Sequence, residues 1–193
     1  LADKLADEND QQILAKATGT IIDQVEAMQQ IVADFSQIAK PLETRRQNLQ
    51  LNPLLRQIAE LYREQHLELD LQEPLGDISA DPVHLRQILI NLMKNAIEAT
   101  QNQDAPQIRW HTSQHNGQIT LDIEDNGPGF ADLNKDPFEP YVTNKPKGTG
   151  LGLAIVKKIV HEHDGTISAG HSRDLGGAKI TITLPLTTTS TTP

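Results

Sequence analysis

The stretch that decides the fold reads Lys147-Gly148-Thr149-Gly150-Leu151-Gly152-Leu153-Ala154-Ile155-Val156. Three glycines alternate with other residues, and an apolar helical period starts directly after them. Glycine lets a backbone approach an anion closely, and the first N–H groups of a helix point toward such an anion. The pattern therefore predicts an anion-binding turn at the start of a helix over about 150–163.

Two earlier segments extend this prediction to a nucleotide pocket. Asn91 and Asn95 lie four residues apart on a helix predicted over 82–100, so they share one face. Their amides can offer an oxygen to Mg²⁺ or an N–H to phosphate without repelling the anion. Asp125 ends an alternating strand and can accept the amine of adenine, while Gly127 and Gly129 leave room for the base. Each segment alone also fits a structural role, as surface amides or a turn.

A long loop at 126–149 separates the aspartate from the glycine turn. It contains glycine and proline without an apolar period, and loops of that length are usually functional. Thr143 and Lys145 could supply a hydroxyl and a positive charge to phosphates, although a loop lysine is more often only solvated. Phe138 and Tyr141 are apolar rings on this loop, which predicts that they dock against another surface when it closes.

Composition limits the class of protein. The chain has 193 residues, a formal net charge of −9 and no cysteine. This charge argues against a surface for nucleic acid or for an anionic membrane, so we expect neither as a partner. The lack of cysteine excludes disulfides and thiolate zinc sites. The sequence contains no run of about 18 apolar residues, and without an initiating methionine Leu1 is expected to be a cut end.

The chain divides into a long helix, a mixed domain and a short tail. Residues 10–39 show a narrow apolar stripe, which predicts packing against a partner helix. Asn116-Gly117 between two alternating segments predicts a β-hairpin. We expect helices at 53–65, 82–100 and 150–163, and strands at 67–71, 107–113, 118–124, 165–170 and 177–184. This order predicts an α/β sandwich in which a mixed sheet is covered on one face by helices. The tail 187–193 is low in complexity and expected to be disordered.

Residues 50–185 resemble the catalytic, ATP-binding domain of bacterial sensor histidine kinases, in the class shared with gyrase, Hsp90 and MutL. Four family motifs occur in family order, the N box at 87–96, the G1 box at 125–129, the F box at 137–141 and the G2 box at 148–153. The run from Phe138 to Gly150 is most similar to the NtrY branch of nitrogen-responsive sensor kinases. The resemblance implies a Bergerat-type ATP-binding fold with ATP and Mg²⁺ as cofactors.

The family's site residues can be placed on matching positions. Asn95 then holds Mg²⁺, Asn91 contacts phosphate or is a second metal ligand, Asp125 recognises adenine, and residues 131–149 form the ATP lid. Glu98 stands where many relatives have a basic phosphate contact, so that contact is expected from Lys94 or Lys145. The expected ATP-binding set is Asn91, Lys94, Asn95, Asp125, Gly127, Gly129, Thr143, Lys145, Gly148, Thr149, Gly150, Leu151 and Gly152.

The implied activity is transfer of the ATP γ-phosphoryl group to a histidine and then to an aspartate of a response-regulator receiver domain. Residues 1–47 then correspond to a truncated dimerisation and phosphoacceptor hairpin, mainly its second helix, and 48–186 to the catalytic domain. The family places the acceptor histidine on the first hairpin helix, which is nearly absent, so no catalytic residue is assigned and self-labelling is not expected. The resemblance also implies a homodimer through the long helix and a cytoplasmic position in a membrane-anchored sensor.

Other histidines do not replace the missing acceptor. His161-Glu162 and His163-Asp164 look like histidine–acid pairs, but we interpret these histidines as helix-end cations favoured by the helix dipole. Asp164 also replaces the first glycine of the family's usual His-Gly-Gly.

Two other classes stay open. An ATP-hydrolysing switch of the gyrase or Hsp90 kind needs a glutamate on the N-box helix, but Gln87 stands where that base is expected, and Glu98 lies farther along. A non-catalytic module that has lost ATP is disfavoured by the intact Asn95, Asp125 and glycines. Steady hydrolysis without an added histidine would support the first class, and no nucleotide binding would support the second.

Overall fold

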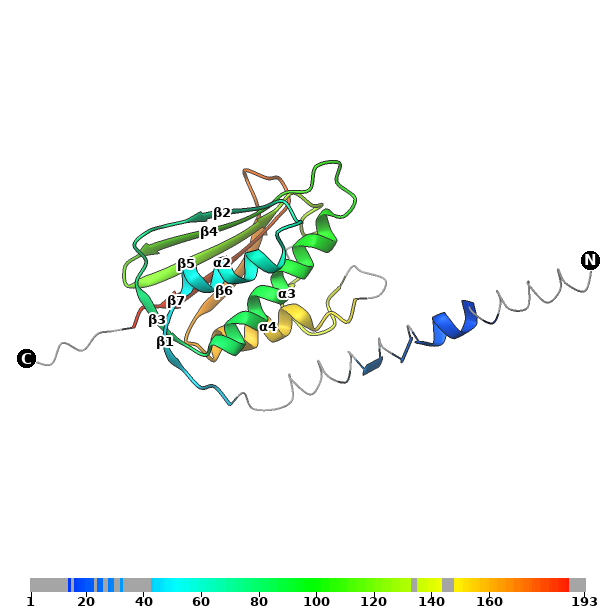
Figure 1. Ribbon diagram of the computed structural model, residues 1–193, viewed down its shortest axis with the longest axis horizontal. Coiled ribbons are helices and arrows are strands. Elements are labelled where there is room, and N and C mark those ends of the chain that lie inside the picture. The colour runs from blue at the N-terminus through cyan, green and yellow to red at the C-terminus, as the bar shows by residue number, and fades with distance from the viewer. Residues whose placement is uncertain are drawn as a thin grey trace, which may run out of the picture.

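The computed structural model describes residues 43–132, 135–143 and 148–187, together with Leu14 and residues 16–22, 24–25, 28–29 and 32. The described residues before 43 are helical and exposed, in agreement with that part of the helix predicted over 10–39 (Figure 1). The rest of that helix and the tail from 188 onward lie outside the described residues.

A five-stranded mixed sheet forms the centre of the domain, as predicted. Its strands are β2 (Leu67–Leu71), β4 (Ile108–His115), β5 (Gln118–Asp125), β6 (Thr166–His171) and β7 (Ala178–Pro185). They lie in the order β2-β4-β5-β7-β6, with β2 parallel to β4 and the other neighbours antiparallel. Asn116 and Gly117 between β4 and β5 both have positive φ, as a tight two-residue hairpin turn requires.

Three helices cover one face of this sheet, namely α2 (Leu51–Leu61), α3 (Pro82–Thr100) and α4 (Gly152–His161) (Figure 1). Alternate strand residues point toward them and form the aliphatic core with Trp110, which is fully buried. The expected layered architecture is thereby confirmed.

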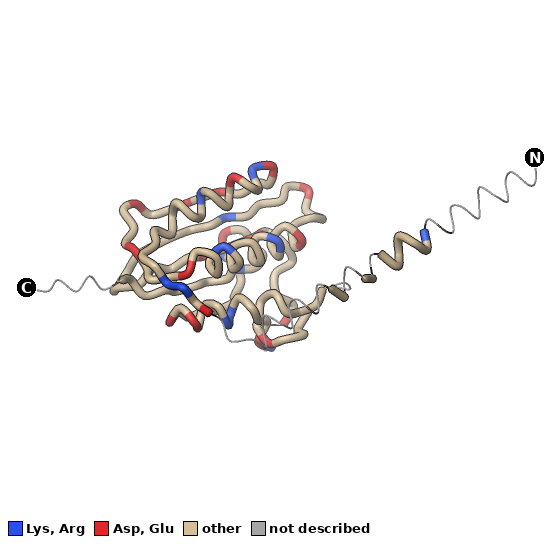
Figure 2. The backbone as a smooth tube through the Cα atoms, turned by 60° about the horizontal axis from the view of Figure 1, so that its bottom comes forward, with Lys and Arg blue, Asp and Glu red and all other residues tan. Residues whose placement is uncertain are grey.

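The opposite face of the sheet is polar. Register places Glu68, Arg109, Glu124 and Lys179 side by side across four strands, so charges of opposite sign alternate. Lys179 Nζ lies 2.8 Å from Asp122 and 3.3 Å from Glu124. Figure 2 shows lysine and arginine interspersed with aspartate and glutamate along the chain rather than gathered in one segment.

A two-stranded sheet at the start of the domain was missed by the sequence analysis. β1 (Gln47–Gln50) pairs antiparallel with β3 (Asp77–Ala80), and a bridge joins Ile78 to Leu186. The sequence QNLQ is polar and short, so it has no alternation to detect. β1 begins one residue before the predicted domain boundary, and helix α2 begins two residues before the predicted start at 53.

The end of the domain also differs slightly from the prediction. Thr187 was assigned to the disordered tail, but its N–H donates to the Asp77 carbonyl at 2.8 Å, and its hydroxyl donates to Asn48 at 3.1 Å. Thr187 is therefore part of the folded domain.

Candidate nucleotide-binding site

Helix α3 presents the two asparagines from its second half. Its start is capped by Asp81, whose Oδ1 accepts hydrogen bonds from the N–H groups of Val83 at 2.9 Å and His84 at 3.4 Å. Its buried stripe includes Leu89, Leu92, Met93 and Ala96. Asn91 and Asn95 are half-buried at the edge of this stripe and one turn apart, whereas Lys94 is exposed. The amides therefore lie where the core meets solvent, which suits ligand groups held by a rigid helix.

Asp125 occupies a position where the strand pattern calls for an apolar residue. It has the same parity as Ile119, Leu121 and Ile123, which all point into the helix-covered core, and only 7% of it is exposed. Its Oδ1 accepts hydrogen bonds from Gly127 N at 2.9 Å and from Ala178 N at 3.2 Å. Burying a carboxylate costs free energy even when backbone N–H groups hold it, and an apolar side chain at this strand position would avoid that cost, so Asp125 is the strongest functional candidate.

The turn after Asp125 is fixed from both sides. Asn126 accepts from Gln107 N at 2.9 Å and donates to the Ala105 carbonyl at 2.7 Å. A Cβ on Gly127 would lie 2.8 Å from the Ala99 carbonyl, so this glycine permits the close approach of helix α3. Gly129 has φ +71°, and its Cβ would lie 3.0 Å from the His171 ring. Both predicted glycines therefore have a packing or backbone reason in addition to the expected room for a base.

Gly177 is a site residue that the sequence analysis missed. Its N–H donates to the Asp125 carbonyl at 3.1 Å, and a Cβ at this position would lie 2.6 Å from Asp125 Oδ1. Any side chain on Gly177 would therefore displace the carboxylate. The available signal was the pair Gly176-Gly177 directly before the last strand, but its contact with Asp125 spans about fifty residues and follows only from the fold.

The glycine turn opens helix α4 as predicted. The residue at the N-cap position is Leu151, whose side chain is apolar and fully buried, so it cannot cap the first N–H groups of the helix. Thr149 Oγ1 accepts a hydrogen bond from Leu151 N at 3.3 Å. A Cβ on Gly152 would meet no atom within 4 Å, whereas a Cβ on Gly150, with φ +66°, would lie 2.7 Å from the Tyr141 backbone. Gly150 therefore shapes the turn, and Gly152 borders open space.

The described part of the predicted lid is anchored to the domain. Phe138 is only 5% exposed and belongs to the core, so the prediction that it docks on another surface is wrong. Lys157 Nζ lies 2.6 Å from Asp136 and over the Phe138 ring, and this bond lowers the pKa of Asp136. Tyr141 N donates to the Gly150 carbonyl at 3.0 Å, while the Tyr141 side chain is 64% exposed.

The remaining predicted phosphate contacts of the lid are Thr143, Lys145, Gly148 and Thr149. Thr143 is exposed, Gly148 and Thr149 are half-buried, and Lys145 lies outside the described residues.

The interpretation of His163 as a helix-end cation is wrong. Its ring is 1% exposed, Nδ1 lies 2.7 Å from the Ile159 carbonyl, and Nε2 accepts a hydrogen bond from Asp81 N at 3.0 Å. One nitrogen thus donates and the other accepts, as in the neutral ring. Burial lowers the pKa of His163, which favours the same form. His161 is exposed at the last position of α4, where the dipole argument still applies.

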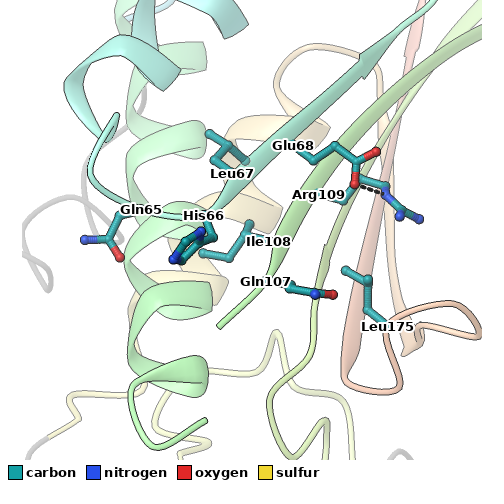
Figure 3. Close-up of a pocket in the computed structure, with 8 residues that line it drawn as sticks. All are labelled: Gln65, His66, Leu67, Glu68, Gln107, Ile108, Arg109 and Leu175. Atoms are coloured by element: carbon teal, nitrogen blue, oxygen red, sulfur yellow. Dashed lines mark hydrogen bonds and ion pairs between the residues drawn. The ribbon is translucent and has the colours of Figure 1, made fainter. Parts of the chain in front are cut away.

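A separate hollow of about 560 Å³ lies where β2 and β4 begin (Figure 3). Arg109 in its wall is engaged by Glu68 at 3.0 Å and Asp174 at 3.3 Å, and none of the predicted ATP-binding residues lines it. Within the described part of the chain, no cluster of three histidine or acidic side chains could hold a metal, so the metal site expected here depends on asparagine and phosphate oxygens. None of the described helices is long and apolar enough to cross a membrane.

Comparisons with known proteins identify relatives over most of the chain. The family model described as histidine kinase-, DNA gyrase B-, and HSP90-like ATPase matches residues 80–188. The sensor histidine kinase ZraS of Escherichia coli O157:H7 is 33% identical over 177 residues, which cover 88% of this chain and 38% of ZraS. The nitrogen regulation protein NtrY of Azorhizobium caulinodans is 34% identical over 184 residues, which cover 91% of this chain and 24% of NtrY.

Structural comparison agrees. Full-length ShkA in complex with AMPPNP is 30% identical, with a TM-score of 0.67 over 81% of this chain and 35% of ShkA. The chain spans between about a quarter and two fifths of the curated relatives described above. ZraS and NtrY match to a similar extent, so these similarities support the kinase resemblance without singling out the NtrY branch.

Proposed function

Because the chain belongs to the family of histidine kinase-, DNA gyrase B- and HSP90-like ATPases, we propose that it binds Mg²⁺–ATP as the catalytic part of a sensor histidine kinase. The observation that supports this most directly is Asp125, a buried carboxylate at a core-facing strand position, held by two backbone N–H groups. A carboxylate accepts the exocyclic amine of adenine through a charge-assisted hydrogen bond, whereas guanine carries a carbonyl at that ring position and cannot donate from it. ShkA, a similar protein, was solved with the ATP analogue AMPPNP.

The phosphates fit between the two helices that border the site. Uncapped N–H groups at the start of α4 and the glycines at 148, 150 and 152 favour negative charge. Asn95, with Asn91 as a second ligand, would hold Mg²⁺ together with phosphate oxygens. When bound, the metal neutralises charge on the transferred phosphoryl group. Lys94, Lys145 and Thr143 are the proposed additional phosphate contacts.

The γ-phosphoryl group is proposed to pass to a histidine outside this domain and then to an aspartate of a response regulator. His163 is unsuited to accept it, because the ring is buried and both nitrogens are bonded. Dimerisation through the first helix is proposed from its exposed apolar residues, which are Leu14, Ile21, Ile22, Val25, Met28 and Val32. Residues 1–47 are accordingly assigned to a dimerisation hairpin, and a cytoplasmic position in a nitrogen-responsive, membrane-anchored sensor remains part of the proposal.

The proposal is tested by separating binding, transfer and hydrolysis. Calorimetry with Mg²⁺–ATP should show binding, and radiolabelled ATP should label a histidine-bearing hairpin domain added in trans but not the chain itself. Label on the chain mapped to His161 or His163 would contradict the assignment of these residues. Steady phosphate release without the added domain would instead favour the hydrolytic switch, and no nucleotide binding would favour a non-catalytic module.

A further inference from the structure

Three segments that are far apart in sequence meet at the start of helix α3. Asp81 N donates to His163 Nε2, which joins the start of α3 to the residue two positions after α4. The helices run in opposite directions, so this contact lies at one end of the pair (Figure 1). At the other end, Gly127 packs against Ala99 near the end of α3. The proposed nucleotide site and the Asp81 contact thus lie at opposite ends of the same helix pair.

The segment that enters the domain is attached to this end by two consecutive residues. Arg45 N donates to Asp81 Oδ2 at 2.8 Å, while Oδ1 of the same carboxylate caps α3. The Arg46 guanidinium pairs with Asp164 and also donates to the Glu162 carbonyl after α4. We call these five residues, Arg45, Arg46, Asp81, His163 and Asp164, the clasp.

The clasp contains a buried hydrogen bond and an exposed ion pair. Asp81 and His163 are 6% and 1% exposed, so their bond belongs to the core. The Arg46 and Asp164 side chains are 35% and 68% exposed, and pairs of that kind contribute little stability. The Arg46–Asp164 pair can therefore break at little cost in stability, while the buried bond between Asp81 and His163 is retained.

Asp164 contributes through its backbone as well as its charge. It has φ +57°, a conformation that aspartate and asparagine tolerate better than most other residues. The left-handed backbone conformation of Asp164 turns the chain sharply after α4, and its carboxylate pairs with Arg46. An asparagine at this position would keep the backbone turn and remove only the charge.

We propose that the clasp is a conformational device that couples the chain before residue 43 to the nucleotide site through helices α3 and α4. With the clasp attached, Arg45 and Arg46 hold the start of α3 and the segment after α4 in one arrangement. A nucleotide bound between the other ends of the helices stabilises the same arrangement, so each event favours the other. The coupling rests on the proposed function, whereas the attachment itself does not.

Trypsin cleavage after Arg45 and Arg46, followed by mass spectrometry, measures the attachment. Asp164→Asn leaves both arginines in place and should speed cleavage there at least threefold relative to cleavage after Lys16 in the exposed first helix. Glu73→Gln is the matched control, because it breaks the exposed Arg56–Glu73 pair elsewhere in the domain and should leave cleavage unchanged. Arg46→Lys keeps a trypsin site but loses the guanidinium that donates to both Asp164 and the Glu162 carbonyl. Cleavage should therefore speed up as in Asp164→Asn.

Coupling is measured by repeating the digestion with Mg²⁺–AMPPNP. Saturating analogue should slow cleavage of the unmodified chain at least threefold, and Asp164→Asn should weaken analogue binding in calorimetry by a similar factor. Equal cleavage of Asp164→Asn and the unmodified chain without nucleotide would overturn the clasp. Binding of the analogue with no change in cleavage would overturn the coupling. Failure to bind would overturn both the proposed function and the coupling, while faster cleavage of Asp164→Asn would still support the attachment.

Discussion

The two ends of the α3–α4 pair are built in opposite ways. At one end, the start of α3 is capped by the Asp81 side chain and joined to the buried His163. At the other end, α4 starts after the apolar Leu151, with open space beside Gly152. A helix start that only supports the fold has its N–H groups satisfied by the protein, whereas one that receives an anion leaves them to the ligand. The difference between the ends therefore supports the proposed placement of the phosphates at the start of α4.

The prediction with the largest expected effect concerns the nucleotide end of the helix pair, where the buried carboxylate of Asp125 is replaced. Asp125→Asn should weaken ATP binding by about 2–3 kcal/mol, because a charge-assisted bond to adenine is lost while an amide oxygen still accepts from Gly127 and Ala178. Asp122→Asn is the control, since it makes the same change on the opposite face of the same strand. Calorimetry showing equal ATP affinity for Asp125→Asn and the unmodified chain would remove the main support for the site.

The second test concerns the metal. Asn95→Ala should weaken ATP binding about tenfold with Mg²⁺ and less than twofold in EDTA, because the lost oxygen acts through the ion. Asn102→Ala, at an exposed position just beyond the helix, is the control. If both conditions weaken binding equally, Asn95 contacts the nucleotide directly and the metal assignment fails.

Two glycines of the same turn sharpen the comparison further. Gly152→Ala meets no neighbour, so unfolding free energy should stay equal or rise by up to about 1 kcal/mol, while phosphate binding weakens several-fold. Gly150→Ala should lower the unfolding free energy by about 1 kcal/mol, because φ is positive and the Tyr141 backbone is close. Urea unfolding and calorimetry on both variants separate the roles. Unchanged ATP affinity in Gly152→Ala would mean that phosphate does not use the space beside it.

The last test concerns stability rather than binding, namely its pH dependence at the end of the helix pair where Asp81 meets His163. Burial lowers the pKa of His163, so between its folded value and about 6.5 the unfolded chain binds more protons than the folded one. Stability is therefore lost as the pH falls below about 6.5, by at most about 1.4 kcal/mol per pH unit. Urea unfolding at pH 5 to 7.5 should show this slope, His163→Gln should flatten it, and His115→Gln at the exposed hairpin should retain it. An unchanged slope in His163→Gln would assign the effect to other groups.

Local patterns predicted much of the fold because they report local chemistry. The start of α3 at residue 82, the Asn116-Gly117 hairpin and the alternation of β4 and β5 each depend on a few neighbouring residues, and all are present. Phe138 and His163 were misjudged because their burial depends on residues that are distant in sequence. Gly177 and the contact between Arg46 and Asp164 were missed for the same reason, since 118 positions separate the members of that pair.

The rows of charge across the uncovered face of the sheet have a consequence for how the protein resists aggregation. β2 is an outer strand, and its exposed side chains on that face are the carboxylates Glu68 and Asp70. A strand from another molecule that added to this edge would have to pair beside two negative charges, and sheets commonly use charged edge residues to prevent such additions. Replacing both carboxylates with valine would convert a soluble edge into a template for fibril-like growth, although the core and the nucleotide site would be untouched.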